Sequence, residues 1–461
     1  MKLRDAIKFI PGLEAVVQKC STCTSDGLRL LMDQEFATDW KAIKHRLDRL
    51  DRAHEMTTRP EFAGALRDVQ HQLMQLRSCR NTLDRLDRGE MLDEIEFFEL
   101  KNVALRGSNV ARMLLGTPLE KLADIPDLAP ALEILDPEKT LAPNFYLYEA
   151  YDPRLAPLRA ELNGCEAGTD RHTELTLRLS ETEREVCHAL SRRLHPLASD
   201  LSKTYNALTD ADMLLAKASA ITDRDSRAAV ADNSPGSGDT TVYKELVNPA
   251  MLGSVKHFQP LDIRLTPGCT VITGANMSGK TVALKTLALA QALFQFGFYV
   301  PAREAIVKPV SRIYLIIGDE QSEFSGLSSY ASEMLKIDGA LKGVRSDDNA
   351  LVLIDEPART TNPAEGAALV TAMVRLFDRC RSFTILTTHY TLHLPGIRRL
   401  RVRGLRDDLP DNVTPGSLGA LIDYTLTEED DSRPPREALR IARLLGVEEE
   451  LLRIAEDNIE I

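Results

Sequence analysis

A glycine-rich loop between a short apolar run and a helical stretch constrains this chain more than any other feature of its sequence. The loop runs Gly274-Ala275-Asn276-Met277-Ser278-Gly279-Lys280-Thr281 and fits the pattern G-x-x-x-x-G-K-[ST]; it follows a predicted strand and opens a predicted helix. Its glycines let backbone N–H groups close around phosphate oxygens, and the helix N-terminus adds partial positive charge. We therefore predict a phosphate-binding loop for ATP, in which Lys280 reaches the β- and γ-phosphates and Thr281 binds Mg²⁺.

Two later motifs fit the same chemistry. In LVLIDEP, four apolar residues precede Asp355 and Glu356, as expected for a buried strand that delivers one carboxylate to the metal and the next to a water molecule. The tandem acids favour hydrolysis over a small-molecule kinase, and the alternative is a strand end whose aspartate caps a turn. In TILTTHY, His389 follows another apolar strand. A lone histidine there is more often structural, but beside the first two motifs we expect it to sense the γ-phosphate.

Periodicity divides the chain into regions of different structure. Leucine and methionine recur every three or four residues over about 25–99 and 155–220, which predicts long amphipathic helices. A proline-rich stretch, Gly116–Pro153, interrupts them, and its Phe145–Tyr148 run predicts one short strand. Residues 221–241 lose hydrophobicity and read as a linker. Beyond them, short β-branched runs alternate with helical text, which predicts a mostly parallel sheet with ligands at the carboxyl ends of its strands.

Composition and charge exclude several classes of protein. The 461 residues allow two or three domains, and a low aromatic content of 5% favours long helices over a β-sandwich. The formal charge of −12 excludes a globally basic surface for nucleic acid, although a local basic stripe could still bind DNA. Seven scattered cysteines argue against a disulfide framework, and Cys20-Ser-Thr-Cys23 has no second pair at zinc spacing. We expect a soluble, cytoplasmic protein without a signal peptide, membrane helix or membrane partner.

Five ordered segments carry a resemblance to a known family. TGANMSGKT, GFYVPA, SGLSSYASEM, LVLIDEPARTTNPAEG and TTHY resemble the ATPase domain of MutS-type proteins. The resemblance also covers LTDADMLLAKA before the linker, REALRIARLLGVEEELLRIA near the C-terminus and, more weakly, the helices from about 24 to 102. It implies an α/β P-loop ATPase domain of the ABC/MutS-like kind, preceded by an all-α core and lever domain and followed by a C-terminal helix-turn-helix. We expect domains at 1–220, 242–425 and 426–461, with the linker at 221–241.

The resemblance also implies a dimer, in which two ATPase domains pair head to tail. The signature segment of one subunit then reaches the nucleotide of the other, so that Ser328 touches the γ-phosphate in trans with Ser325, Gly326 and Ser329 beside it. Phe258 matches a position where an aromatic ring stacks on adenine, and the alternative is that it belongs to the core. The terminal helix pair helps to hold the dimer through Ile441, Leu445 and Leu451. The partner is a second copy or a related subunit.

The sequence departs from the family pattern in the loop after Glu356. This loop reads Pro-Ala-Arg-Thr-Thr-Asn-Pro where the family has a glycine-rich segment, so two glycines are replaced by Ala358 and Thr360, and Pro363 stiffens it. Leu327 replaces a common arginine of the signature. We expect altered coupling between subunits, and a short form without the mismatch-recognition and connector domains.

Three functions fit these features. The first is a dimeric Mg²⁺-dependent ATPase whose closure moves the long helices as levers on double-stranded or branched DNA, selective for structure and not for mismatches. The second is an ATP-dependent remodelling factor for a protein client, as proposed for short MutS relatives beside cobalamin-dependent aminomutases. The third is a nucleotide-gated scaffold with little turnover, against which the intact Lys280, Asp355, Glu356 and His389 argue.

Overall fold

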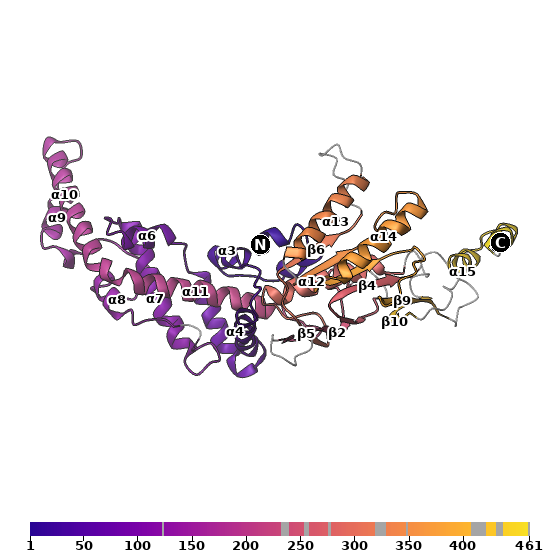
Figure 1. Ribbon diagram of the computed structural model, residues 1–461. Helices are drawn as coiled ribbons and strands as arrows, with labels where there is room; N and C mark the ends of the chain where they lie inside the picture. The colour runs from indigo at the N-terminus through magenta and orange to yellow at the C-terminus, as the bar shows by residue number, and fades with distance from the viewer. Residues whose placement is uncertain are drawn as a thin grey trace. The chain divides into compact units, whose positions relative to one another are not determined.

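The chain forms two compact units in the computed structural model (Figure 1), which describes residues 1–121, 124–231, 239–252, 258–274, 278–318, 329–346, 349–406, 421–429 and 437–459. The helical unit comprises Lys19–Asp33 and Asp48–Ala220. The sheet unit comprises Met1–Gln18, Gln34–Leu47 and Ile221–Ile461. Helix α4 (Trp40–Thr58) begins in the sheet unit and continues into the helical unit.

Besides its part of α4, the helical unit contains α3 (Ser25–Met32), α5 (Ala63–Met74), α6 (Arg80–Asp87), α7 (Glu94–Leu114), α8 (Ala129–Leu135), α9 (Leu155–Asn163), α10 (Asp170–Leu194) and α11 (Ala198–Ser219). Its interior is built around α7 and α11. Helix α11 packs against α3, α5, α6 and α7, and α7 also packs against α8. The leucine spacing read from the sequence places Leu201, Leu208 and Leu215 in this interior, where each is at most 2% exposed.

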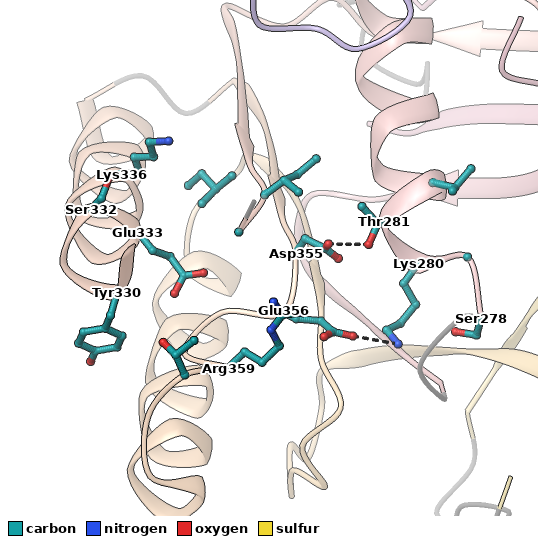
Figure 2. Close-up of a pocket in the computed structure, with 16 residues that line it drawn as sticks. Ser278, Lys280, Thr281, Tyr330, Ser332, Glu333, Lys336, Asp355, Glu356 and Arg359 are labelled. Atoms are coloured by element: carbon teal, nitrogen blue, oxygen red, sulfur yellow. Dashed lines mark hydrogen bonds and ion pairs between the residues drawn. The ribbon is translucent and has the colours of Figure 1, made fainter. Parts of the chain in front are cut away.

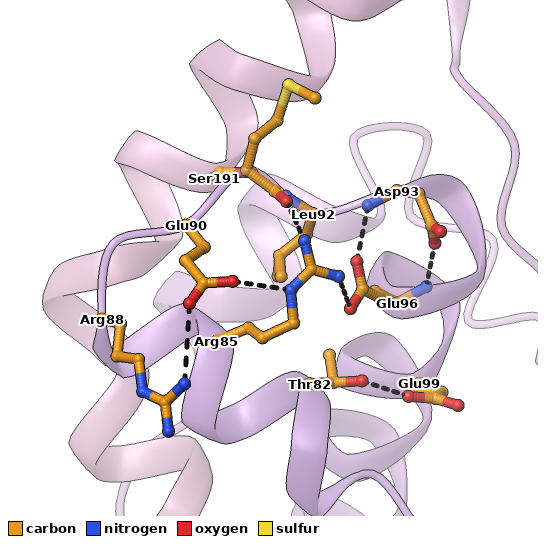
Figure 3. Close-up of polar contacts among 10 residues, drawn as sticks. Thr82, Arg85, Arg88, Glu90, Leu92, Asp93, Glu96, Glu99 and Ser191 are labelled. Carbon is orange, nitrogen blue, oxygen red and sulfur yellow. Dashed lines mark hydrogen bonds and ion pairs between the residues drawn. The ribbon is translucent and has the colours of Figure 1, made fainter.

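Local polar signals start these helices and secure their turns. Asp93 and Glu96 form a capping box at the start of α7, so that each side chain accepts from the other residue's backbone N–H. Arg85 of α6 bonds to Glu90 and the Met91 carbonyl in the turn before α7 and to Glu96 of α7, and the Ser191 hydroxyl of α10 accepts from Leu92 N (Figure 3). The contacts tie the α6–α7 turn to α10.

The strand predicted at Phe145–Tyr148 is wrong. These residues have no regular structure, and no strand is described in the helical unit for them to pair with. Instead the rings of Phe145 and Tyr148 lie 5.9 Å apart, and those of Tyr148 and Tyr151 lie 5.5 Å apart. Aromatic packing, and not a strand ladder, explains the apolar run.

The sheet unit contains two sheets and the helices that cover them. Its strands are β1 (Ala229–Val230), β2 (Thr241–Leu246), β3 (Leu261–Leu265), β4 (Gly268–Thr273), β5 (Glu304–Val307), β6 (Arg312–Ile316), β7 (Ala350–Ile354), β8 (Phe383–Thr387), β9 (Arg398–Leu405) and β10 (Ile422–Glu428). Its helices are α1 (Leu3–Ala6), α2 (Leu13–Val17), α12 (Lys280–Gln295), α13 (Ser329–Ser346), α14 (Pro363–Asp378), α15 (Glu437–Leu444) and α16 (Glu449–Ile459).

The main sheet has the strand order β10-β9-β4-β8-β7-β6, and the described pairs are parallel except β9–β10. This confirms the predicted mostly parallel sheet. Alternate residues of β7 separate its faces: Val352 and Ile354 join a core with α13 and α14, whereas Leu351 and Leu353 are buried outside that cluster. Helix α12 packs against β6, β7 and β8, and we assign it to this second face. A smaller sheet, of order β1-β5-β2-β3, completes the unit.

The N-terminal residues correct the predicted domain boundaries. Residues 1–18 and 34–47 were expected in the helical domain, yet they belong to the sheet unit. Ala37 and Gln295 of α12 exchange hydrogen bonds of 3.2 and 2.7 Å, and the rings of Phe36 and Phe296 lie 5.5 Å apart. Because residues 286–295 of α12 are all buried, this part of the helix is covered on the side away from the sheet as well.

Two other predicted boundaries differ from the strands. Part of the predicted linker at 221–241 forms β1, which pairs in parallel with β5. The boundary between 425 and 426 falls inside β10 (Ile422–Glu428). Strand β1 has only two residues, and β10 mixes polar with apolar residues, so hydropathy alone did not distinguish them from loop. Helices α15 and α16 follow, and Gly446 between them adopts φ 75°. Within the described residues, no helix has the length and apolar character that crossing a membrane requires.

Candidate nucleotide site

The predicted phosphate loop lies between β4 and the first turn of α12. Ala275, Asn276 and Met277 fall outside the described residues. Gly274 and Gly279 adopt φ 148° and 79°, and a Cβ on Gly274 would lie only 2.9 Å from the Ser278 hydroxyl oxygen. That hydroxyl is buried and finds no hydrogen-bond partner within the described part of the chain. A buried donor at the start of a 16-residue helix fits an anion such as a phosphate group.

Lys280 points from this loop toward the acidic motif. Its ammonium group donates to the Gly274 carbonyl at 2.9 Å and lies 3.1 Å from Glu356 Oε1 (Figure 2). The side chain is only 4% exposed. A buried lysine costs free energy unless it is paired, and here its partners include one carboxylate and one backbone carbonyl. These contacts hold the Lys280 ammonium group in position beside the phosphate loop.

The residues predicted to hold Mg²⁺ are adjacent. The Thr281 hydroxyl donates to Asp355 Oδ2 at 2.6 Å, and the Thr387 hydroxyl donates to Asp355 Oδ1 at 2.7 Å. A threonine hydroxyl and a carboxylate side by side are oxygen ligands of the kind that Mg²⁺ takes together with phosphate oxygens and water. The donor set fits this ion. Sequence reasoning missed Thr387, although it ends the strand beside that of Asp355 and lies two residues before His389.

Glu356 and His389 meet at the same edge of the sheet. The Glu356 backbone N–H is directed to Thr387, with distances of 3.0 Å to its hydroxyl and 3.2 Å to its carbonyl oxygen. His389 Nδ1 lies 3.9 Å from Glu356 Oε2, and its ring packs 4.3 Å from that of Tyr390. His389 is 37% exposed. It therefore borders the site without a close hydrogen bond to the glutamate.

Lys280, Thr281, Asp355 and Glu356 line a cavity of about 660 Å³, whereas His389 and Thr387 are not among its lining residues. The phosphate loop and the acidic pair form one wall, and Tyr330, Ser332, Glu333 and Lys336 of α13 form another (Figure 2). Arg359 and Thr360, from the loop after Glu356, also line it. The sequence did not predict that α13 of the same chain lines this cavity, because nothing local relates its residues to the phosphate loop.

The predicted trans signature is described only at its end. Ser325, Gly326 and Ser328 lie outside the described residues, and Ser329 is the first residue of α13. The next described positions, Tyr330 and Ser332, line the cavity of their own chain. The reach of the signature to a second subunit stays a prediction.

A second cavity of about 190 Å³ adjoins the phosphate loop. Phe258 is half-buried and lines it, which favours the ligand-facing interpretation over the core alternative. Tyr424 of β10 also lines it, and a Cβ on Gly279 would meet that ring at 2.8 Å. Gln259 ties the two regions together, because its side chain bonds to Asp423, Tyr424 N and Thr425. Tyr424 was missed because it lies far along the chain from every recognised motif.

Comparisons with known proteins match the part of the chain that contains the phosphate loop and the acidic pair. A family model for MutS domain V matches residues 270–400, which include Lys280, Asp355, Glu356 and His389. Among curated proteins, Endonuclease MutS2 of Agathobacter rectalis is 31% identical over 243 residues, which cover 52% of this chain and 29% of that protein. Endonuclease MutS2 of Ligilactobacillus salivarius is 34% identical over 237 residues, or 47% of this chain and 28% of that protein.

A shorter segment of 122 residues is 43% identical to Endonuclease MutS2 of Acetivibrio thermocellus, covering 26% of this chain and 15% of that protein. The matched segments therefore span less than a third of each of these relatives. The resemblance carried by the ordered motifs and the independent family match lead to the same conclusion. The chain is a MutS-related protein.

Proposed function

We propose that this chain is a Mg²⁺-dependent ATPase of the MutS type. The observation that carries the proposal is the convergence of Lys280, Asp355 and Glu356 on one cavity beside a phosphate loop. A structural ion pair would close this space, whereas here the three groups line a volume large enough for a nucleotide. Lys280 binds the β- and γ-phosphates, and Thr281 and Asp355 hold Mg²⁺, which supplies charge neutralisation at the phosphates.

Glu356 is the catalytic base of the proposed reaction. It takes a proton from the water whose oxygen attacks the γ-phosphorus, while the bond from that phosphorus to the β–γ bridging oxygen breaks. His389 stands beside Glu356 and is the candidate sensor of the γ-phosphate. Phe258 and Tyr424 line the smaller cavity and bind the adenine base there.

The test replaces Glu356 in the purified full chain. Glu356→Gln keeps the shape of the side chain but removes the base, so we expect ATP binding within about two-fold of wild type and turnover lowered by about 100-fold or more. Glu365→Gln, an exposed glutamate in the first turn of α14, is the matched control and should behave as wild type. Wild-type turnover in Glu356→Gln would remove this residue from the role of base.

We further propose that hydrolysis is coupled to DNA, because the relatives that match are named as endonucleases. Steady-state ATPase rates should be compared without DNA and with homoduplex, mismatched and four-way-junction DNA, at low and higher salt. Stimulation by one DNA form that weakens as salt rises supports coupling through phosphate contacts. Hydrolysis indifferent to every DNA contradicts it and directs attention to a protein client.

Dimerisation through the C-terminal helices completes the proposal. Leu445, Leu451 and Ile454 of the α15–α16 pair are exposed by 42%, 58% and 50%, which fits a surface that a second subunit covers. In a mixed dimer of Ser328→Ala and Lys280→Ala subunits, action of Ser328 in trans leaves about one working site. If Ser328 acts in cis, both subunits of that dimer are inactive.

A further inference from the structure

The loop that carries Glu356 has an unfavourable backbone conformation. Glu356 and Ala358 adopt φ 42° and 61°, in the left-handed region where a Cβ is disfavoured, and Pro357 stands between them. Ala358 is fully buried. Non-glycine residues keep this conformation only where their surroundings hold them there. The groups that hold the loop are therefore relevant to the position of Glu356.

Three hydrogen-bonding groups hold it, each from a different element. Thr387 of β8 accepts from Glu356 N, as described above. The carboxylate of Glu333 on α13 accepts from Ala358 N at 3.1 Å. The hydroxyl of Tyr390, beyond β8, donates to the Ala358 carbonyl at 2.9 Å. The N–H of the buried Ala358 is thus paired with the Glu333 side chain, and its carbonyl with the Tyr390 hydroxyl and, at 3.3 Å, with Thr361 N.

The surrounding packing is shaped around the tyrosine. A Cβ on Gly366, in the first turn of α14, would lie 2.3 Å from the Tyr390 hydroxyl oxygen. Only glycine leaves room for the ring at this position, and Gly366 is itself buried. The absence of a side chain at Gly366 is therefore what lets the Tyr390 hydroxyl reach the Ala358 carbonyl.

Partial burial of the Glu333 carboxylate costs free energy, because it removes a charged group from water. Glu333 is half-buried, and burial raises the pKa of its carboxyl group, although the Ala358 N–H and the charge of Arg359 oppose the shift. A buried carboxylate persists where it satisfies a specific donor, and here the donor is the Ala358 amide.

We propose that Glu333 and Tyr390 are positioning residues that hold the loop after Glu356 in its left-handed conformation and thereby place the base. This inference rests on the proposed role of Glu356 in ATP hydrolysis. It also links that base to the signature segment, because α13 begins at Ser329, the last of the predicted signature residues. A displacement of α13 reaches Ala358 through the Glu333 carboxylate.

The experiment compares three variants of the full chain. Glu333→Met removes the acceptor and keeps the side-chain length, Glu333→Gln keeps a carbonyl acceptor, and Tyr390→Phe removes the donor and keeps the ring. The measurements are kcat and KM for MgATP, the affinity for a fluorescent ATP analogue, and hydrogen exchange of the peptide 355–362 without nucleotide. Asp338→Asn, an exposed acid on α13 that pairs with Lys342, is the matched control.

We expect Glu333→Met and Tyr390→Phe to lower kcat by about ten-fold or more with nucleotide affinity within about two-fold, because a small displacement of a base costs rate and not binding. Both should speed exchange of the 355–362 peptide. Glu333→Gln should retain kcat within about three-fold, since its carbonyl still accepts from Ala358 N. Melting curves and Tyr390→Phe separate this effect from a failure of Glu333→Met to fold.

The two proposals fail in different ways. Wild-type kcat and unchanged exchange in both Glu333→Met and Tyr390→Phe overturn the positioning role, as does an equal loss in Glu333→Gln and Glu333→Met. If the wild-type protein does not hydrolyse ATP, the proposed function fails, and the exchange measurement decides whether the loop is held as described.

Discussion

Buried polar side chains serve the two units in different ways. In the sheet unit, Lys280 pairs with Glu356, and Asp355 accepts from the Thr281 hydroxyl; these four residues also line a cavity. In the helical unit, Lys101 and Asp136 are 1% and 2% exposed, and Lys101 Nζ lies 3.0 Å from Asp136 Oδ1 and 2.9 Å from the Tyr148 hydroxyl oxygen. The same residue types thus occur in an open and in a closed arrangement.

The closed arrangement is complete without a ligand. Burial alone would raise the pKa of Asp136, but hydrogen bonds from Leu141 N, Lys101 and Thr140 outweigh it and lower that pKa. Arg85 near the α6–α7 turn is similarly occupied by Glu90, Glu96 and a carbonyl (Figure 3). A buried ionisable cluster is therefore a candidate site only where its members also face space that a reactant can enter. Substitutions in the two clusters should separate activity from stability.

The largest effect is expected at the open cluster. Lys280→Met should lower ATP turnover by about 1000-fold, because the charge beside the transferred phosphate is lost. Its melting temperature should be unchanged or higher, since active-site groups are often placed at the expense of stability. Lys285→Met, on the same helix and outside both cavities, is the control. Turnover above about a tenth of wild type in Lys280→Met would contradict the proposed role of Lys280 and, with it, the contrast between the open and the closed cluster.

At the closed cluster the effect should fall on stability. Asp136→Asn leaves the Lys101 charge buried without its counter-ion, so we expect the free energy of unfolding of the helical unit to fall by about 3–5 kcal/mol. Turnover at a temperature where the variant is folded should match wild type. Chemical denaturation followed by circular dichroism measures the loss.

Two companion variants sharpen this prediction. Glu138→Gln, an exposed acid nearby, should change the free energy of unfolding by less than about 0.5 kcal/mol. The double replacement Lys101→Met with Asp136→Leu should lose less than Asp136→Asn, because an apolar pair leaves no buried charge. A loss of activity without a loss of stability in Asp136→Asn would contradict the structural role.

Smaller changes in ATP binding are expected at the second cavity, where the adenine base is proposed to bind. Phe258→Ala and Tyr424→Ala should each weaken ATP binding by about ten-fold, since stacking of one aromatic ring on a base contributes about 1–3 kcal/mol. Tyr146→Ala, an exposed aromatic of the helical unit, is the matched control. Equilibrium titration with a fluorescent ATP analogue measures all three. Unchanged affinity in Phe258→Ala would return this residue to the core alternative.

The last prediction concerns thiol reactivity, and not activity or stability, at the Cys20-x-x-Cys23 motif in the helical unit. Burial, followed by the charge and hydrogen bond of Asp212, raises the pKa of the Cys23 thiol to about 11. Because the thiolate is the reactive form, Cys23 should be alkylated at pH 8 about 100-fold more slowly than an ordinary thiol, with a rate that rises up to about pH 11. Mass spectrometry after iodoacetamide treatment measures this, with half-exposed Cys165 as the comparison. Rapid alkylation of Cys23 would indicate a reactive thiol and would contradict its raised pKa.

The alternating strands were predicted from a contiguous signal, and the mostly parallel sheet is confirmed. The phosphate loop and the Asp355-Glu356 pair were recognisable because each is a short segment with its own backbone requirement. The structure brings these segments to one cavity, and their roles stay predictions. The strand predicted at Phe145–Tyr148 and the placement of residues 1–18 and 34–47 were wrong, since neighbours far along the chain decided both. Glycine replacement at Ala358 was visible in the sequence. Its left-handed conformation was not.

By itself the sequence indicated the family, the type of fold in the sheet unit and the short motifs that meet at one cavity, because each of those signals lies within a few residues. Only the tertiary structure decided which distant groups complete the site. Thr387 binds Asp355, Tyr424 lies against Gly279, and Glu333 and Tyr390 hold Ala358. Each of these contacts joins separate elements of the sheet unit, and its existence depends on how those elements pack, which no local pattern encodes.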